Sequence, residues 1–328
     1  MADYKGIQGR SVQSLSTDPG TVENVLGQLW YNTTTGTYKL ATENALSTGA
    51  WSSAPNLNVA RYYFNGAGSV TEGIVCAGSP NYYYVEEFDG TSWTEVNDVS
   101  NQKGYAGVNG TQTACMICGT GAPSPASYFY TETYDGTSWT EVNNLNNGRS
   151  NAGPSAGPTS AGVIMGGTPT PTVAGATETW DGTCWTETGH LLTTNTQGRA
   201  GFGTQTACIS VGGESTYTES ETYNGSTWTE GNELNTGRGN FSGSGVTTAA
   251  IVAAGGPYPV GNYSETYDGT SWSAAPTTAQ SHGSAACMGS VGSGISGAFV
   301  AGGYAPGHVN HVDHWSYTQY EAKTVTVS

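Results

Sequence analysis

Two sets of residues in this chain have the side-chain chemistry of a reactive or metal-binding site. The first is the segment GHVNHVDHW, which contains His308, His311 and His314 beside Asp313. Histidine and aspartate together bind zinc or iron in many proteins. The second is a basic and an acidic residue that recur together along the chain, a combination that can mark either an acid–base pair or a structural ion pair.

The histidine segment has the spacing of an extended strand as well as that of a metal site. Alternate side chains of a strand lie on opposite faces, so His308 and His314 share one face and His311 lies on the other. Three ligands for one ion therefore require the chain to bend. His314 and Asp313 also occupy positions that other repeats fill with Thr and Glu. We expect a strand or loop role here and no cofactor, with a metal site at His308 and His314 as the alternative.

The repeated charges predict structural ion pairs. A basic residue follows a Trp by ten positions, or by fourteen where four residues are inserted, and an acidic residue precedes a later aromatic residue by two. The basic set is Arg61, Lys103, Arg149, Arg199, Arg238 and His282, and the acidic set is Glu86, Glu132, Glu178, Glu221, Glu265 and Asp313. Active sites seldom occur six times in one chain, so we expect partly buried, hydrogen-bonded pairs that set the geometry of each repeat.

These charges lie within a sequence repeat. Near-copies of TETYDGTSWT, residues 131–140, recur every 43 to 46 residues and end at or near Trp93, Trp139, Trp185, Trp228 and Trp272. This period is typical of solenoids, propellers and arrays. Within a repeat there is no helical periodicity, only short runs rich in Thr, Tyr, Val and Trp between Gly, Asn and Asp, which predicts strands and turns.

Each repeat divides into four strands. A Gly/Ala/Ser-rich inner strand follows the basic residue, a second strand ends on glycine six times along the chain, and a third strand leads through a D-G or N-G turn to the outer strand at the Trp. Such dipeptides are strong hairpin signals. Small residues on inner strands and large ones on outer strands suit radially arranged blades, so the sequence predicts an all-β, six-bladed β-propeller of four-stranded blades.

The two ends of the chain determine how such a ring closes. Trp51 begins AWSSAPNLNVAR, an outer-strand sequence without a third strand before it, while the last repeat has Tyr320 where its Trp is expected. We predict that the Trp51 strand completes the sixth blade and removes exposed sheet edges. The alternative is closure by a strand at Tyr320. We assign residues 50–328 to the propeller and residues 1–49 to an attachment module with a β-hairpin arm within 27–40.

Two resemblances follow from these motifs. The order of a glycine pair, E-x-aromatic-D-G, Trp and Arg resembles the kelch repeat over residues 51–320. Kelch-type propellers include the central domain of galactose oxidase and many binding scaffolds. In addition, KGIQGRSVQSLSTDPG and GQLWYNTTTGTYKL ahead of Thr/Gly/Asn-rich repeats resemble virion structural proteins of tailed phages.

Composition excludes several classes of partner. The formal charge of −16 argues against binding to nucleic acid or anionic membranes. The start has no apolar leader and no stretch is apolar enough to span a bilayer, so we expect no signal peptide, synthesis in a host cytoplasm and a place in the virion. The six cysteines suit buried free thiols, and the isolated Cys115-x-x-Cys118 is expected to pack as small apolar residues.

The remaining candidate site is the variable loop between the second and third strands. In a propeller these loops emerge on one face, where aromatic side chains suit sugar stacking or protein docking; the alternative is that they only cover the blade ends. The aromatic residues concerned are Tyr82, Tyr83, Tyr84, Tyr128, Phe129, Tyr130, Tyr217, Tyr258 and Tyr304.

No nucleophile elbow, phosphate-binding loop or HExxH motif occurs, so we expect a protein that is not an enzyme. The predicted function is a tail-fibre or receptor-binding module for a host-surface glycan or protein. Residues 1–49 would attach it to other virion proteins, in several copies or as a homo-oligomer. The alternatives are a capsid decoration or head-fibre protein, a galactose-oxidase-like metalloenzyme and a cellular kelch adaptor.

Overall fold

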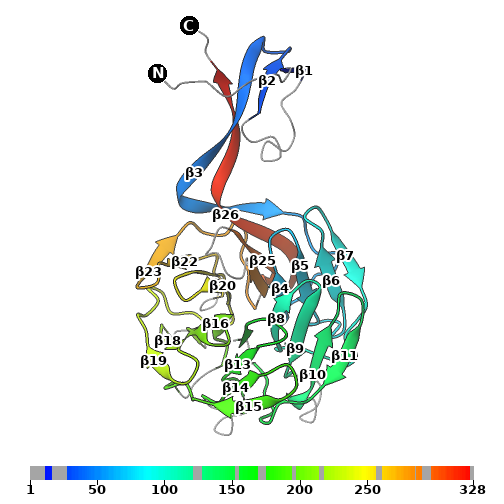
Figure 1. Ribbon diagram of the computed structural model, residues 1–328, viewed down its shortest axis with the longest axis vertical. Coiled ribbons are helices and arrows are strands. Elements are labelled where there is room, and N and C mark those ends of the chain that lie inside the picture. The colour runs from blue at the N-terminus through cyan, green and yellow to red at the C-terminus, as the bar shows by residue number, and fades with distance from the viewer. Residues whose placement is uncertain are drawn as a thin grey trace. The chain divides into compact units, whose positions relative to one another are not determined.

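The computed structural model describes residues 12–16, 28–120, 128–151, 155–168, 175–193, 197–213, 218–255, 261–284, 286–289 and 297–325 (Figure 1). Across these residues the chain forms strands, turns and loops, with no helix that could cross a bilayer. The chain divides into two compact units, Met1–Gly49 with Tyr317–Ser328, and Ala50–Ser316. The sequence assigned residues 317–328 to the repeats, whereas the structure groups them with the N-terminal residues.

The larger unit contains repeated four-stranded antiparallel sheets, as predicted. The first has β4 (Asn65–Gly68), β5 (Gly73–Cys76), β6 (Val85–Phe88) and β7 (Trp93–Val96). The second has β8 (Gly107–Thr111), β9 (Ala114–Cys118), β10 (Thr131–Tyr134) and β11 (Trp139–Val142). The third has β12 (Ser155–Ala156), β13 (Val163–Met165), β14 (Thr177–Trp180) and β15 (Trp185–Thr188).

The fourth sheet has β16 (Ala200–Thr204), β17 (Ala207–Val211), β18 (Ser220–Tyr223) and β19 (Trp228–Glu230). The fifth has β20 (Ser242–Val246), β21 (Ala249–Ala253), β22 (Ser264–Tyr267) and β23 (Trp272–Ala275). The last sheet has β24 (Ala286–Gly289), β25 (Gly297–Tyr304), β26 (His308–Val325) and β3 (Thr37–Ala54) side by side, and continues from β3 through β2 (Leu29–Asn32) to β1 (Gln13–Leu15).

The sheets of the larger unit surround a common centre in a propeller-like arrangement. Strands β4, β8, β16 and β20 lie toward that centre, and β7, β11, β15, β19 and β23 lie at the periphery (Figure 1). The first strands of neighbouring sheets contact one another in chain order, and β24 contacts both β20 and β4. Small inner residues allow this approach: a Cβ atom on Gly243 of β20 would lie 2.6 Å from the Phe202 side chain of β16. The prediction of small residues on inner strands and large residues on outer strands therefore matches the order of strands within the sheets.

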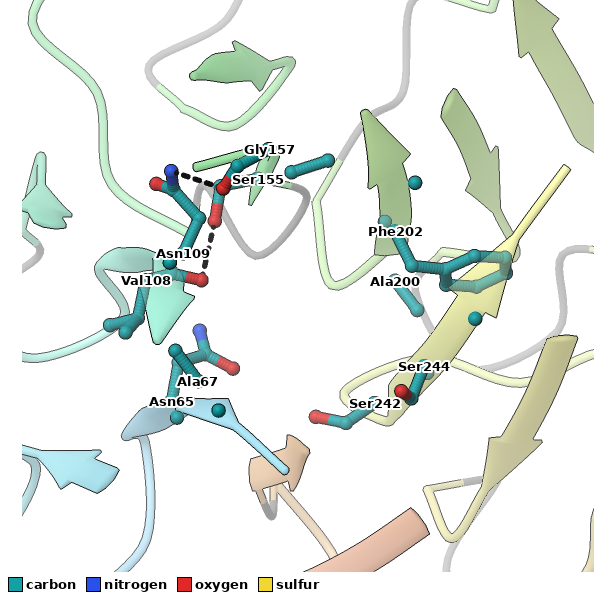
Figure 2. A pocket seen from close by; sticks show the side chains of 18 of the residues that line it. Asn65, Ala67, Val108, Asn109, Ser155, Gly157, Ala200, Phe202, Ser242 and Ser244 are labelled. Atoms are coloured by element: carbon teal, nitrogen blue, oxygen red, sulfur yellow. Dashed lines mark hydrogen bonds between the residues drawn. The ribbon is translucent and has the colours of Figure 1, made fainter. Parts of the chain in front are cut away.

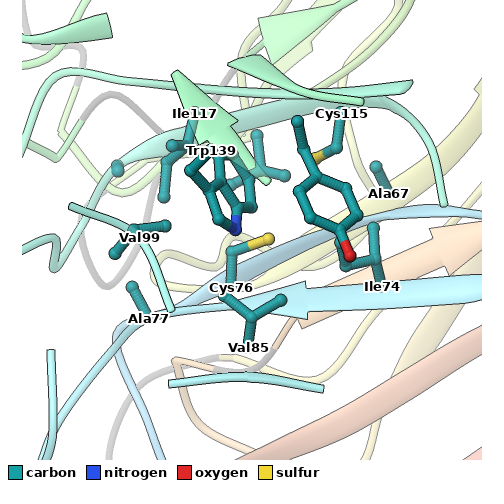
Figure 3. Close-up of a cluster of buried hydrophobic side chains, with 12 residues drawn as sticks. Ala67, Ile74, Cys76, Ala77, Val85, Val99, Cys115, Ile117 and Trp139 are labelled. Carbon is teal, nitrogen blue, oxygen red and sulfur yellow. The ribbon is translucent and has the colours of Figure 1, made fainter. Parts of the chain in front are cut away.

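The hydrophobic core lies between adjacent sheets. Figure 3 shows one cluster, in which Ile74 and Val85 of the first sheet meet Ile117 and Trp139 of the second, all buried. Trp139 packs on Tyr134 with ring centroids 5.0 Å apart, and its indole Nε1 donates to the Asn97 carbonyl at 3.0 Å. The outer-strand Trp of one sheet is thereby hydrogen-bonded to the segment that follows the outer strand of the preceding sheet.

The turns between third and outer strands form as predicted. The Oδ1 atom of Asp135 accepts hydrogen bonds from the backbone N–H groups of Thr137 and Ser138 at 2.9 and 2.7 Å, and Gly136 has φ +91°. Glycine adopts this left-handed conformation without a Cβ clash. The N–H groups of Ser138 and then Thr137 lower the pKa of Asp135 because they stabilise its charged form.

The last sheet combines segments from both ends of the chain. Trp51 of β3 lies 5.4 Å from Trp315 of β26, ring to ring, close to the 5.0 Å between Tyr134 and Trp139. Strand β26 continues without interruption to Val325, so the segment around Tyr320 begins no separate outer strand. Which strand closes a ring stays a prediction.

The smaller unit contains the predicted hairpin. Strands β2 and β3 pair antiparallel, with Leu29 opposite Leu40 and Asn32 opposite Thr37, and β1 pairs parallel with β2. The Asn32 side chain closes the turn by accepting from the backbone N–H groups of Thr34 and Thr35, both at 3.0 Å.

Candidate functional site

The repeated basic and acidic residues meet within each sheet. The prediction of ion pairs is confirmed, but their burial is greater than expected, because no side chain of the six pairs is more than 2% exposed. The pairs are Arg61–Glu86, Lys103–Glu132, Arg149–Glu178, Arg199–Glu221, Arg238–Glu265 and His282–Asp313.

The third sheet shows what each pair does. Arg149 Nη2 lies 2.5 Å from Glu178 Oε1, while Arg149 Nη1 donates to the carbonyls of Gly166 and Ala176 at 3.1 and 2.8 Å. Those two carbonyls mark the start and end of the variable loop between β13 and β14. The guanidinium therefore joins both stems of the loop, and we call this arrangement the loop clamp.

The carboxylate of the loop clamp holds a second segment. The backbone N–H groups of Asn146 and Asn147 donate to Glu178 at 2.7 and 3.1 Å, which ties the connection from the preceding outer strand to the same site. Burial lowers the pKa of Arg149, and the charge of Glu178 opposes that shift. A buried pair with all its hydrogen bonds made offsets its desolvation cost and fixes geometry.

The same clamp recurs in other sheets. Arg61 donates to the carbonyls of Ala77 and Tyr84, and Arg199 to those of Ser210 and Glu219. Ala77 directly follows β5, whereas Ser210 lies within β17, and Tyr84 and Glu219 directly precede the third strands β6 and β18. The stem that leads into the third strand is therefore held at an equivalent place in these sheets, while the contact on the second strand differs.

Two clamps are chemically different. Lys103 lies 3.8 Å from Glu132 and donates to the Tyr130 carbonyl at 2.9 Å, and burial lowers its pKa to about 8. In the last sheet, His282 contacts the Gly302 carbonyl through Nδ1 at 2.8 Å and Asp313 Oδ2 through Nε2 at 3.2 Å. Both make fewer contacts than the Arg149 clamp.

The predicted loop aromatics that the structure describes differ in exposure. Phe129 and Tyr304 are exposed, with 39% and 41% of their surface accessible. Tyr82, Tyr83, Tyr84, Tyr128 and Tyr130 are half-buried, whereas Tyr217 and Tyr258 lie outside the described residues. Tyr83 packs against the core between the first two sheets. Tyr83 therefore contributes to packing, and a binding role for the other loop aromatics stays a prediction.

A different aromatic cluster forms beside the first inner strand. The Tyr62 ring lies 4.0 Å from that of Tyr63, 5.7 Å from that of Tyr304 and 4.7 Å from that of His308, and Tyr63 stacks on Tyr105 at 3.8 Å. The sequence interpretation missed Tyr62, Tyr63 and Tyr105. The sequence feature that could have identified them is their position one or two residues after the basic residue of a clamp.

The inner strands line an axial pocket with a cavity volume of about 90 Å³ (Figure 2). Ser155 Oγ donates to the Val108 carbonyl, and Asn109 Nδ2 donates to the Gly157 carbonyl, both at 2.9 Å, so polar side chains link β8 to the third sheet at its wall. Arg199 is the one charged residue among those that line this pocket, and it is paired with Glu221. The lining is neutral and polar, with many glycines.

The candidate metal ligands have separate surroundings. His308 contacts the Tyr62 ring, whereas His314 lies 5.1 Å from Phe299, and burial lowers the pKa of His314. A register shift between Ala301 and Gly303 lies between their pairing positions on β25. Within the described ranges, no three His, Cys, Asp or Glu side chains are grouped in a way that could hold a metal ion.

The CxxC thiols are buried and unpaired, as the sequence predicts. Cys115 and Cys118 are free, and burial raises the pKa of Cys118 to about 12. A thiol with so high a pKa is a poor nucleophile at neutral pH.

The fold and the loop clamps define the class of this protein: it is an all-β repeat protein with four-stranded antiparallel sheets in a propeller-like arrangement. No family model and no curated protein sequence matches the chain.

Proposed function

We propose that the chain is a non-enzymatic virion component, a tail-fibre or receptor-binding module built on a closed, kelch-type, six-bladed propeller. The observation that carries the binding role is the loop clamp, in which one buried guanidinium contacts the strands on both sides of a variable loop in the first, third and fourth sheets. Binding sites are commonly formed by loops on a rigid scaffold. The virion assignment is supported by the resemblance of residues 1–40 and the Thr/Gly/Asn-rich repeats to phage structural proteins.

Closure by the Trp51 strand is part of this proposal. The indole Nε1 of Trp185 donates to Thr131 Oγ1 and that of Trp228 to Thr177 Oγ1, each reaching the first residue of a third strand in the preceding sheet. Trp51 Nε1 donates in the same way to Ser264 Oγ, at 3.2 Å. Trp51 thus occupies the place of an outer-strand Trp in a blade that follows the fifth sheet.

Backbone contacts support closure from the other side. The N–H of Leu57, which follows β3, donates to the Asn310 carbonyl of β26 at 2.8 Å. The N–H of Tyr63, which precedes the first inner strand, donates to the Ser284 carbonyl, which precedes the last, at 3.1 Å. These bonds join residues more than 200 positions apart, and a closed ring leaves no sheet edge open to unwanted pairing.

A binding role accounts for the charges better than catalysis does. The clamp pairs are enclosed in the sheets, and their hydrogen bonds are used on loop stems. The axial pocket is lined by neutral groups apart from the paired Arg199. We propose that residues 1–49 attach the chain to other virion proteins in several copies.

The test is incorporation into particles. Phage particles would be assembled with the full chain or with a variant that lacks residues 1–36 and keeps β3. We expect the variant to fold but to be absent from purified particles. Normal incorporation would show that the N-terminal residues do not attach the protein. Antibody labelling of the full chain at the head instead of the tail would favour the capsid decoration or head-fibre alternative.

A further inference from the structure

Six residues surround a second pocket at the end of the inner strands where the variable loops begin. They are Tyr63, Tyr105, Asn151, Gly198, Asn240 and Ser284, and we call them the crown. All six have a left-handed backbone, with φ between 49° and 65°. Five of them stand two residues after the basic residue of a clamp, and Gly198 stands one before Arg199.

The crown backbone is joined by hydrogen bonds between sheets. The N–H of Tyr105 donates to the Tyr63 carbonyl at 2.9 Å, that of Ser284 to Asn240 at 2.8 Å and that of Asn240 to Gly198 at 2.9 Å. The bond from Tyr63 to Ser284 continues the series. These backbone N–H and carbonyl groups are therefore already hydrogen-bonded to one another. A ligand in the pocket would be contacted by the crown side chains.

Side chains at these positions carry a conformational cost. A left-handed backbone costs an L-residue roughly 1–2 kcal/mol, and a bulky residue such as tyrosine is rarely found there. Glycine has no such cost, and Gly198 shows that the crown accepts glycine. Strained residues of this kind tend to gather at ligand sites. The presence of tyrosine at two of these positions, despite its conformational cost, therefore indicates a functional role for the side chains.

The chemistry of the crown is neutral and amphipathic. Tyr63 and Tyr105 are half-buried and stack on one side, and the side chains of Asn151, Asn240 and Ser284 supply uncharged donors and acceptors. Burial, reinforced by Tyr63, raises the pKa of Tyr105, so its phenol remains a hydrogen-bond donor. Arg199, the charged lining residue, is paired with Glu221 at 3.2 Å.

We infer that the crown pocket binds one pyranose ring of an uncharged glycan. The apolar face of the sugar would pack on the Tyr105 side of the stacked tyrosine pair, because Tyr62 and Tyr105 cover the two faces of Tyr63. Its hydroxyl groups would bond to the asparagine and serine side chains. The net charge of −16 disfavours anionic sugars. This inference rests on the proposed binding function and names its ligand class.

The test is titration of the full chain with methyl glycosides of glucose, galactose, mannose and N-acetylglucosamine, and with sialic acid as the anionic probe, followed by calorimetry or ligand-observed NMR. We expect at least one neutral glycoside to bind and sialic acid not to. Tyr63→Gly should weaken binding by about tenfold or more, corresponding to about 1.4 kcal/mol. Its thermal midpoint should change little, because relief of the left-handed backbone offsets the loss of the ring contacts with Tyr62 and Tyr105.

Controls separate the site from general effects. Tyr263→Ala changes a tyrosine that is 55% exposed and outside the crown, and should bind as the unmodified protein does. If Tyr63→Gly does not fold, Asn240→Gly and Ser284→Gly test the same pocket. The inference is overturned if no neutral glycoside binds, if sialic acid binds better, or if the folded crown variants bind normally.

Particle incorporation distinguishes this inference from the proposed function. A chain that enters particles but binds no sugar would contradict the crown site alone. A chain that binds sugar but is absent from particles would contradict the virion role alone.

Discussion

The third sheet and the last sheet of the larger unit hold their variable loops with different chemistry. In the third, Glu178 accepts two backbone N–H groups and Arg149, and the guanidinium reaches both loop stems. In the last, the shorter Asp313 accepts from Gln280 N and His282, and within the described residues its buried Oδ1 has no hydrogen-bond partner.

The difference shows how clamp strength depends on side-chain length and charge. Arginine carries a fixed charge and five donors, whereas histidine titrates near neutral pH and has two. The weaker clamp lies in the sheet that combines β24, β25 and β26 with β3. The seam of the proposed ring is thus the place where the repeat is least complete, and the following predictions test that contrast.

The largest effect is expected from breaking the complete clamp. Glu178→Gln leaves the buried Arg149 charge without its partner, which costs about 3–5 kcal/mol of unfolding free energy. Denaturant unfolding measures it. Glu187→Gln is the matched control, because Glu187 pairs with Glu178 across β14 and β15 but is exposed, and a change within about 0.5 kcal/mol is expected there. Equal effects at both sites would contradict the clamp.

The seam should respond to loss of its Trp. Trp51→Ala removes the ring contact with Trp315 and the bond to Ser264, and because Trp51 is half-buried we expect a loss of about 2 kcal/mol. Trp139→Ala in a continuous sheet should cost more, about 3–5 kcal/mol. A Trp51 variant as stable as the unmodified protein would show that β3 does not complete the last sheet.

Restoring the common clamp should strengthen the last sheet. The double change His282→Arg with Asp313→Glu installs the pair found in four other sheets, and we expect a gain of about 1 kcal/mol from the added hydrogen bonds. The gain should be read from thermal unfolding at neutral pH. The single change His282→Arg, with the short Asp313 retained, should increase stability less than the double change does. A double variant that is less stable than the unmodified protein would contradict the comparison.

A further prediction concerns pH. Burial lowers the pKa of Lys103 to about 8 in the folded chain, below the ordinary value of 10.5. Between these values the unfolded chain binds more protons, so the contribution of Lys103 to stability rises with pH across that window. Lys103→Arg removes this titration. The free energy of unfolding should be measured for both proteins at pH 7.5 and pH 10. We expect the unmodified protein to become more stable relative to the variant at the higher pH. An equal difference between the two proteins at both pH values would contradict the prediction.

The sequence was sufficient for features that depend on local signals repeated along the chain. The D-G turn at Gly136, the hairpin of β2 and β3, and the Arg149–Glu178 pair all follow from residue types at fixed spacing. The crown could not be predicted, because the left-handed backbone of Tyr63 is imposed by bonds between sheets and not by tyrosine itself. The separation of His308 from His314 likewise accompanies a register shift that no residue type signalled.

Native-state hydrogen exchange at residues 51–54 tests most directly whether the N-terminal strand closes the ring. The reference is Trp139–Val142, the outer strand of a continuous sheet. The account predicts that both sets of amides exchange slowly and lose protection only on global unfolding. Rapid exchange at 51–54, with Trp139–Val142 protected, would contradict closure by this strand.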